Sequence, residues 1–442
     1  MMKAKPAPAM APGGVELLPA VPDLPASEAA GVEADWQRAA ALVEPDVPAY
    51  LRTTYQVDVQ GQYAGRPTRN PFGKASGQLS LNLRQVESDA AVGLGFVVLK
   101  TVIGQDASGH QAMAAWAAPE TRMAVEPIAG RRVARLGWTV SWKGRGWSES
   151  LESYLALVQA AARLGREAGM LVAASCKYHL PGPEETVYRE EEYRFTTAKL
   201  HDAWRQAGEI GPLVLEKDFS PTLAGSDHAS QQAQVMDWLR EVPRLIKGAL
   251  PQPAEVVLGI KVMNTLFDDA FQVAMLRELA TASAPRRADY VVYANRLFDP
   301  RRAVAGTVGI AYGGPDLSGR NLAVLAAARA AAAVEGWLEA WLPLSGTGDV
   351  SSGRMAVEYG LRGASSVQIH TLFQLPDPYY GAPVAGRTAS KSAKALHRLY
   401  FHPLDGLVPW LLHLRHHDGL MDAQGMTRWL DLPTVEARQE RL

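Results

Sequence analysis

The stretch WLPLSGTGDVSSGRMAVEYGLRGASSVQIHTLF (residues 341–373) carries the most informative pattern in the chain. It begins with a short apolar run at 341–348, continues with an amphipathic segment of helical length at 354–363, and ends with a second apolar run at 366–373. Near-continuous apolar runs are typical of strands buried on both faces, and helices join such strands in parallel sheets. The stretch therefore predicts a strand–helix–strand unit.

The same alternation extends backwards from this stretch to Asn70. Further strand-like runs occur at 70–77, 96–103, 170–177, 212–219, 256–263 and 289–296. Segments of helical character lie between them at 151–168, 237–248, 268–282 and 320–340. Eight such runs predict an α/β fold, a (β/α)8 TIM barrel, and favour it over the competing interpretation of an open, doubly wound sheet.

Segments outside this alternation suggest three parts: an N-terminal extension (1–52), the barrel (53–375) and a C-terminal helical extension (376–442). Residues up to about Ala30 are rich in Pro and Ala and are expected to be disordered. A helix over 34–50 and a hairpin within 53–70 should follow. A long insert rich in Trp and Arg occupies 113–147, and an extra amphipathic helix is expected within 402–420.

Composition narrows the function classes. The formal net charge of -1 over 442 residues gives no reason to expect a nucleic-acid partner. The single cysteine, Cys176, excludes an intrachain disulfide and a site held by four cysteines of this chain. No apolar run of about 18 residues suggests a membrane span, and the first residues lack the apolar core of a signal peptide. We expect a cytoplasmic protein without a metal site.

Polar residues stand at the ends of the predicted strands, where barrels of this kind form their active sites. Lysines in apolar runs, notably Lys100 and Lys261, are costly to bury without a negative partner, and they indicate a bound anion or an electron-rich ring. The alternative for a single such lysine is a buried ion pair. The turn at 346–348 precedes a helix, so its backbone N–H groups predict a phosphate site.

Taken together, residues 53–375 resemble the dihydroorotate dehydrogenase family. NPFGKASG (70–77) is similar to the family's first strand, whose backbone lies under the flavin, and GGPDLSG (313–319) is similar to its glycine-rich loop. The resemblance implies bound FMN, with its phosphate held by Gly346, Thr347, Gly348, His370 and Thr371. The other residues implied to contact FMN are Ala75, Ser76, Gly77, Lys100, Lys261, Asn295, Ser318 and Gly319.

The chemistry implied by the resemblance is oxidation of a C–C bond beside a carbonyl. A base removes a proton while hydride passes to N5 of the flavin. The family's base corresponds to Ser220 in DFSPTLAGSD (218–227), and Lys100 is the second implied catalytic residue. A serine needs water or another hydroxyl to carry the proton onward. The alternative is that Ser220 only turns the loop before Pro221.

The chain departs from the family where orotate is bound. The family uses asparagines there, whereas this sequence has Lys217 and Thr222 beside the base loop and no asparagine in RLGWTVSWKGRGW (135–147). Loss of such partners disfavours a substrate that needs them. Trp138 and Trp142 predict a larger, aromatic pocket, so we expect another cyclic carbonyl compound, for example one like a dihydropyrimidine.

Several alternatives stay open at this point. The chain could be a genuine dihydroorotate dehydrogenase with altered contacts, or a non-catalytic barrel that binds FMN or phosphate. It could also be a flavin-free barrel in which Lys100 or Lys261 forms a Schiff base. An FMN enzyme of this composition needs a small-molecule substrate and a separate electron acceptor, and a homodimer is the family expectation.

Overall fold

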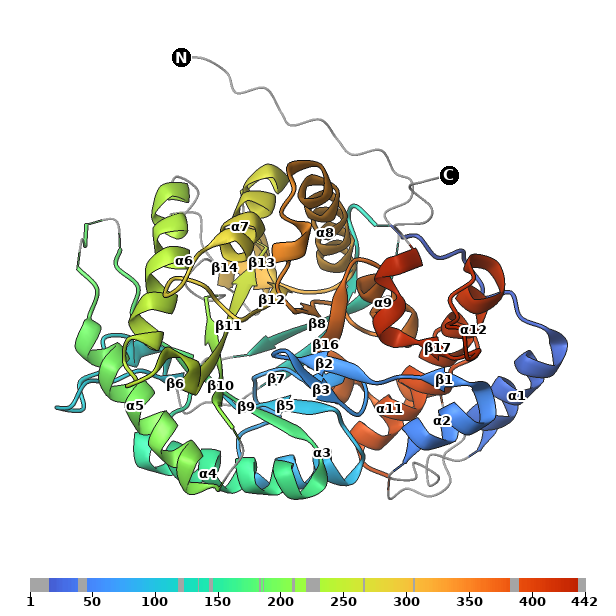
Figure 1. Cartoon of the computed structure of the whole chain (residues 1–442), viewed down its shortest axis with the longest axis horizontal. Coiled ribbons are helices and arrows are strands. Elements are labelled where there is room, and N and C mark those ends of the chain that lie inside the picture. Colours follow the sequence, from blue (N-terminus) through green and yellow to red (C-terminus); the bar gives the residue numbers. More distant parts are fainter. Residues whose placement is uncertain are drawn as a thin grey trace, which may run out of the picture.

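The computed structural model of this chain contains a closed ring of parallel strands with helices packed around its outside (Figure 1). The structure describes residues 16–38, 46–117, 123–133, 135–142, 146–182, 184–185, 187–208, 211–219, 231–264, 267–304, 307–381 and 389–435.

The ring confirms the predicted TIM barrel. Its strands, in spatial order, are β4 (Phe72–Lys74), β5 (Phe96–Val98), β9 (Leu171–Lys177), β10 (Leu213–Asp218), β11 (Val256–Met263), β12 (Tyr290–Asn295), β15 (Leu344–Thr347) and β16 (Ala364–Ile369). Every neighbouring pair is parallel, and β16 pairs with β4, which closes the ring and rules out the open sheet. A short continuation of the second predicted strand, β6 (Val102–Ile103), also pairs with β9.

Helices follow the strands and cover the ring. They are α3 (Leu83–Ala91), α4 (Leu151–Ala168), α5 (Glu190–Gln206), α6 (Gln232–Lys247), α7 (Asp269–Thr281), α8 (Pro315–Glu335) and α9 (Gly353–Leu361). The bounds of α4 were predicted correctly because Ser150 caps its first turn and Gly169 ends it in a left-handed conformation. Among the described residues, no helix is long and apolar enough to cross a membrane.

The glycine-rich segment 313–319 was predicted as a loop, but most of it is helix. Gly314 precedes α8 with a positive φ of 102°, and Pro315 occupies the first helical position, where its missing N–H costs nothing. Helix α8 therefore starts five residues earlier than the predicted start at 320. Ser318 and Gly319 consequently lie in its first turns rather than in a loop.

The interior of the ring is closed at its N-terminal end by the predicted hairpin, β2 (Gly61–Tyr63) and β3 (Arg66–Thr68). The Tyr63 ring stacks on Phe96 at 4.0 Å between centroids and meets Tyr290 edge-on at 5.1 Å. Gly73 and Gly259 make room for these rings, since a Cβ at either glycine would lie about 2 Å from one of them. Three aromatic rings therefore fill the lower layer of the barrel.

Two further hairpins lie near the C-terminal ends of the strands. The insert at 113–147 contains β7 (Met123–Ala129) and β8 (Leu136–Trp142), and a second hairpin is formed by β13 (Leu297–Val304) and β14 (Thr307–Tyr312). Ile128, Leu297, Tyr312 and Leu317 form a small apolar cluster between the hairpins and α8. Arg296 links the hairpins by donating to Val140 O and Ala311 O, both at 3.0 Å.

The helices that precede and follow the barrel in sequence form a layer beside α9, on one side of the barrel (Figure 1). The predicted helix over 34–50 is wrong, because α1 (Ala26–Gln37) ends before that span does and α2 (Val47–Tyr55) begins at its end. Disorder was expected up to about Ala30, whereas α1 already starts at Ala26 and Leu18 N donates to Glu358 at 2.8 Å. The other elements are α10 (Asp377–Tyr380), α11 (Lys391–Phe401), α12 (Leu407–Asp418), β1 (Val57–Asp58) and β17 (Thr427–Arg428).

Candidate active site

The C-terminal ends of the ring strands bring together most of the described residues that the sequence singled out. Side-chain hydroxyls link the first three strand ends: Ser76 Oγ lies 2.8 Å from Thr101 Oγ1, which lies 2.9 Å from Ser175 Oγ. Beside Ser76, the Ala75 N–H donates to Ile369 O at 3.0 Å. The strand ends are therefore held together by side chains as well as by the sheet.

Two of the lysines at these ends, Lys100 and Lys217, are deeply buried, and burial disfavours their charged forms. The pKa of Lys100 is lowered to about 8 because burial removes water from its ammonium, and the Asp218 carboxylate offsets this only in part. Burial likewise lowers the pKa of Lys217 to about 8, again with Asp218 as the largest opposing charge. The Asp218 carboxylate thus raises the pKa of two lysines, Lys100 and Lys217.

A third lysine belongs to the same group. Lys177, at the end of β9, is 2% exposed and its Nζ lies 4.8 Å from the centre of the Trp116 ring. Lys217 Nζ lies 4.6 Å from the Phe219 ring and donates to Asp218 O at 3.2 Å. We call Lys100, Lys177, Lys217 and Asp218 the lysine cluster. Aromatic faces and carbonyl oxygens stabilise ammonium groups, but more weakly than a carboxylate does.

Lys261 is placed differently from the lysine cluster. Its Nζ lies 3.3 Å from Glu216 Oε1 and donates to Gln368 Oε1 at 2.9 Å, and all three residues are buried. The alternative that the sequence left open for a single lysine, a buried ion pair, is therefore the one found for Lys261.

The predicted phosphate turn requires glycine at two positions. Gly348 has a φ of 102°, and a Cβ there would lie 2.8 Å from Ala294 O. At Gly346 a Cβ would lie 2.6 Å from the Tyr359 ring. Between them, Thr347 Oγ1 donates to Gln368 O at 3.2 Å. The turn is therefore tightly packed and its backbone conformation is set by its surroundings.

Asn321 of α8, which the sequence did not single out, holds this turn in place. Its Nδ2 donates to Thr347 O at 2.8 Å and to Ala294 O at 2.9 Å. The Tyr359 hydroxyl, which accepts from Asn321 Nδ2 at 3.0 Å, donates to Gly348 O at 2.8 Å. Both side chains bind carbonyl oxygens of the turn, so its N–H groups are not engaged by them.

His370 and Gly77 lie in direct contact across the site. A Cβ at Gly77 would lie 2.3 Å from His370 Nε2, so only glycine fits against this ring. Burial, together with nearby cations such as Arg296 and Lys100, lowers the pKa of His370 to about 3. The imidazole is therefore neutral at physiological pH, and its Nδ1 lies 2.9 Å from Gln374 Nε2. Thr371 begins the short helix Thr371–Gln374 next to it.

A second charged group lies beside the predicted phosphate turn. Asp349 follows Gly348, and its carboxylate lies 3.2 Å from Arg135 Nη2 of the β7–β8 hairpin. Arg135 also contacts Glu16 at 2.7 Å, and Glu16 pairs with Arg354 of α9. We call these four residues the arginine cluster. Burial raises the pKa of Asp349 to about 6, against the lowering effects of Arg135 and Ser318.

Ser318 and Gly319 lie where α8 meets the β7–β8 hairpin. Ser318 Oγ donates to Asp349 Oδ2 at 2.9 Å, and a Cβ on Gly319 would lie 2.8 Å from Val133. Asp316, in the first turn of α8, accepts hydrogen bonds from the Arg131 and Arg132 N–H groups. The tip of the hairpin is therefore anchored to the start of α8, which the sequence did not indicate.

The remaining predicted residues are only partly placed. Asn295 ends β12, and its carbonyl accepts a hydrogen bond from Asn264 N at 3.4 Å. The Trp138 ring meets Tyr379 edge-on at 5.8 Å, which fits a role in lining the mouth of the barrel. Trp142 ends β8, but its side chain lies outside the described residues, as do Ser220 and Thr222.

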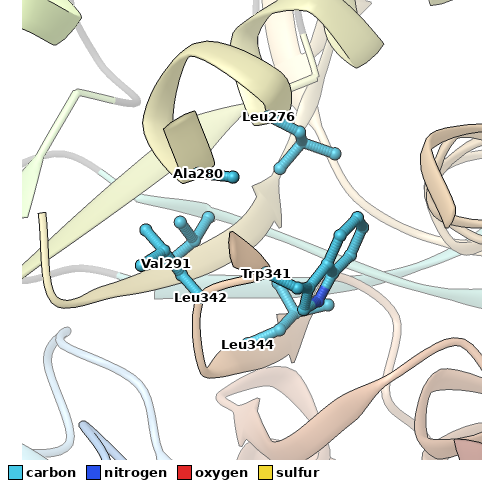
Figure 2. Close-up of a pocket in the computed structure, with 6 residues that line it drawn as sticks. All are labelled: Leu276, Ala280, Val291, Trp341, Leu342 and Leu344. Carbon is cyan, nitrogen blue, oxygen red and sulfur yellow. The ribbon is translucent and has the colours of Figure 1, made fainter. Parts of the chain in front are cut away.

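A small apolar pocket lies away from these residues, between α7 and the starts of β12 and β15 (Figure 2). Leu276, Ala280 and Val291 line it with three neighbours, Trp341, Leu342 and Leu344. It has room for about one water molecule. With no charged group among its lining residues, it is a packing gap rather than a catalytic site.

Comparison with known proteins does not assign a family. No protein-family model matches the chain, and no curated protein shows significant sequence similarity to it. Within the described residues there is no group of three or more His, Cys, Asp or Glu side chains that could hold a metal ion.

Proposed function

We propose that this protein is an FMN-dependent oxidoreductase acting on a C–C bond next to a carbonyl in a cyclic substrate. The observation that supports this most strongly is the burial of three lysines, Lys100, Lys177 and Lys217, at the strand ends. For Lys100 and Lys217, burial lowers the pKa more than the Asp218 carboxylate raises it. An electron-rich ring that lies against these ammonium groups would offset the cost of burying them.

The described residues fit FMN as the bound group. Gly77 allows the neutral His370 ring to approach the backbone at 75–77, and Gly348, with a φ of 102°, follows β15 shortly before α9, where helix N-terminal N–H groups favour an anion. The residues proposed to hold the ring are Ala75, Ser76, Gly77, Lys100, Lys261 and Asn295. Those proposed to hold the phosphate are Ser318, Gly319, Gly346, Thr347, Gly348, His370 and Thr371.

The proposed mechanism needs a hydride acceptor, a positive charge beside it and a base that removes a proton from the substrate. FMN, when bound, would supply a hydride acceptor for oxidation of the substrate's C–C single bond to a double bond. Lys100 would hold a positive charge beside the ring, where it would stabilise negative charge that develops during reduction. Ser220 Oγ takes the proton that leaves the neighbouring carbon and passes it to water or to another hydroxyl.

The proposed substrate is a cyclic carbonyl compound other than dihydroorotate. Lys217 occupies a position where the resembling family has an asparagine, and this lysine is fully buried at the strand end. A cation cannot replace both the donor and the acceptor of an amide. The single cysteine of this chain cannot hold an iron–sulfur cluster that would carry the two electrons onward. We therefore propose a separate electron acceptor: a small oxidant, a quinone or another protein.

The absorbance spectrum of the purified protein tests this proposal. We expect the two visible bands of oxidised flavin, release of FMN on heating, and bleaching when the right cyclic substrate is added without oxygen. A Gly348→Ala variant should lose FMN, since the new Cβ would lie 2.8 Å from a backbone oxygen in a left-handed conformation. A colourless wild-type protein that also fails to take up added FMN would refute the proposal.

A second candidate function is favoured by the same lysines. An amine with a pKa near 8 is partly unprotonated at neutral pH, so Lys100 or Lys217 could attack a carbonyl and form a Schiff base, as in aldolases. Borohydride in the presence of the carbonyl substrate would then add a stable mass to one of these lysines. A flavin spectrum without such labelling would exclude this candidate.

A further inference from the structure

A closed network of polar side chains lies inside the ring, below the strand ends. Glu216 of β10 is 0% exposed. Its Oε2 accepts hydrogen bonds from Gln368 Nε2 at 2.5 Å and from the Tyr63 hydroxyl at 3.0 Å. Its Oε1 accepts from Lys261 Nζ at 3.3 Å, and Lys261 also donates to Gln368 Oε1 at 2.9 Å. Three side chains, from β2, β11 and β16, therefore converge on one carboxylate of β10.

The network continues to the bottom of the barrel. The Tyr63 hydroxyl lies 3.3 Å from the Tyr290 hydroxyl, which donates to Leu215 O at 3.3 Å. Tyr63 is the hairpin residue whose ring is stacked on Phe96, so its hydroxyl cannot move away without disturbing the lower aromatic layer. The position of the Glu216 carboxylate is therefore set by a residue at the opposite end of the barrel from the proposed flavin.

The charge of Lys261 is balanced within the network. One ammonium faces one carboxylate, and two neutral groups satisfy the remaining bonds of that carboxylate. In the lysine cluster, by contrast, burial lowers the pKa of Lys100 and Lys217 more than the Asp218 carboxylate raises it. Lys100 and Lys261, both assigned to the same cofactor ring, thus lie in different electrostatic surroundings.

We propose that Glu216 is a positioning residue for the flavin site. With Tyr63 and Gln368 it holds the Lys261 ammonium in place and cancels its charge, so that Lys261 acts as a fixed hydrogen-bond donor toward the ring rather than as a net positive charge. This inference rests on the proposed function, because it concerns a bound flavin.

The midpoint potential of bound FMN tests the inference. Glu216→Gln removes the negative charge but keeps the shape, and it leaves Lys261 uncompensated. Positive charge favours the electron-rich reduced form, so the equilibrium constant for reduction should rise by roughly tenfold or more, since charges act strongly across a dry interior. Lys261→Met should lower the constant, and the double variant Glu216→Gln/Lys261→Met should return it close to the wild-type value.

A milder pair of variants covers the case in which Glu216→Gln does not fold. Tyr63→Phe removes one hydrogen bond to Glu216 and should shift the constant by about threefold in the same direction. The matched control is Tyr50→Phe, which removes a tyrosine–carboxylate bond of 2.8 Å to Asp35, outside the barrel, and should leave the potential unchanged.

The outcomes separate the two proposals. Wild-type protein that binds no FMN refutes the proposed function. Wild-type protein that binds FMN, together with Glu216→Gln or Tyr63→Phe variants whose potential equals that of wild type or falls below it, overturns the role of Glu216 alone.

Discussion

The lysine cluster and the arginine cluster solve the burial of charge in opposite ways. In the arginine cluster two guanidinium groups, Arg135 and Arg354, meet two carboxylates, Glu16 and Asp349. In the lysine cluster the opposing charge of Asp218 is shared by Lys100 and Lys217, and burial prevails over it. The first arrangement pairs each cation with a carboxylate, whereas we propose that the second becomes favourable when an electron-rich group binds.

From this difference we infer that the arginine cluster is structural and the lysine cluster functional. Buried charge whose desolvation outweighs its partners lowers the stability of the empty protein, and active sites tolerate such a cost because the bound molecule recovers it. The arginine cluster instead joins four segments that are far apart in sequence: the N-terminal extension, the β7–β8 hairpin, the turn after β15 and α9. The variants below test whether the two clusters differ in this way.

The largest effect is expected from breaking the balanced cluster. Arg135→Met should lower the free energy of unfolding by about 3 kcal/mol, because it leaves the buried Asp349 carboxylate without its cation. Urea denaturation of the FMN-free protein would measure the change. Arg240→Met is the control, since Arg240 is 45% exposed and its pair with Glu278 should contribute about 0.5 kcal/mol. Equal effects of both substitutions would contradict a special role for Arg135.

A substitution in the lysine cluster should change the free energy of unfolding less than Arg135→Met does, and in the opposite direction. Lys100→Met should raise the unfolding free energy of the FMN-free protein by about 2 kcal/mol, because it removes an ammonium whose burial is poorly compensated. The same variant should weaken the hold on FMN. Lys74 on the neighbouring strand is also buried but is paired with Asp89, so Lys74→Met should destabilise instead. Destabilisation by both substitutions would remove the distinction between the clusters.

The alkaline side of the pH profile sharpens this test. Because the pKa of Lys100 falls from 10.5 to about 8 on folding, the unfolded chain binds more protons between these values. The unfolding free energy contributed by Lys100 therefore rises as pH increases from about 8 to about 10. Subtracting the profile of Lys100→Met from that of wild type should isolate this slope, and a flat difference would contradict it.

The same two clusters show which features of the fold and the site could be predicted from the sequence. The eight strands and the lysines were predictable because apolar runs with a lysine near their C-terminal end are local patterns. The arginine cluster was not, since Glu16 lies in a segment expected to be disordered and Arg135 in an irregular insert. Their meeting is decided by tertiary packing alone.

The pairing of Glu216 with Lys261 could have been predicted from the sequence, although it was not. Both residues interrupt apolar runs of adjacent predicted strands, and opposite charges inside neighbouring buried strands are expected to meet. Tyr63, by contrast, stands in a hairpin whose position under the barrel no local pattern could indicate. The segment that carries Ser220 and Thr222 lies outside the described residues, so the roles proposed for these residues stay predictions.

The last test concerns Asp349 on the acid side. Folding raises the pKa of this carboxyl from 3.8 to about 6, so between these values the folded protein binds more protons than the unfolded chain. The contribution of Asp349 to stability is then greatest below about pH 4 and is lost as pH rises to about 6, the reverse of an ordinary paired carboxylate. Asp349→Asn should remove this decline. Urea denaturation of both proteins from pH 4 to pH 7 would measure the difference. If the difference instead grew with pH, Arg135 would stabilise the carboxylate more than burial disfavours it, and the arginine cluster would be more strongly balanced than its geometry indicates.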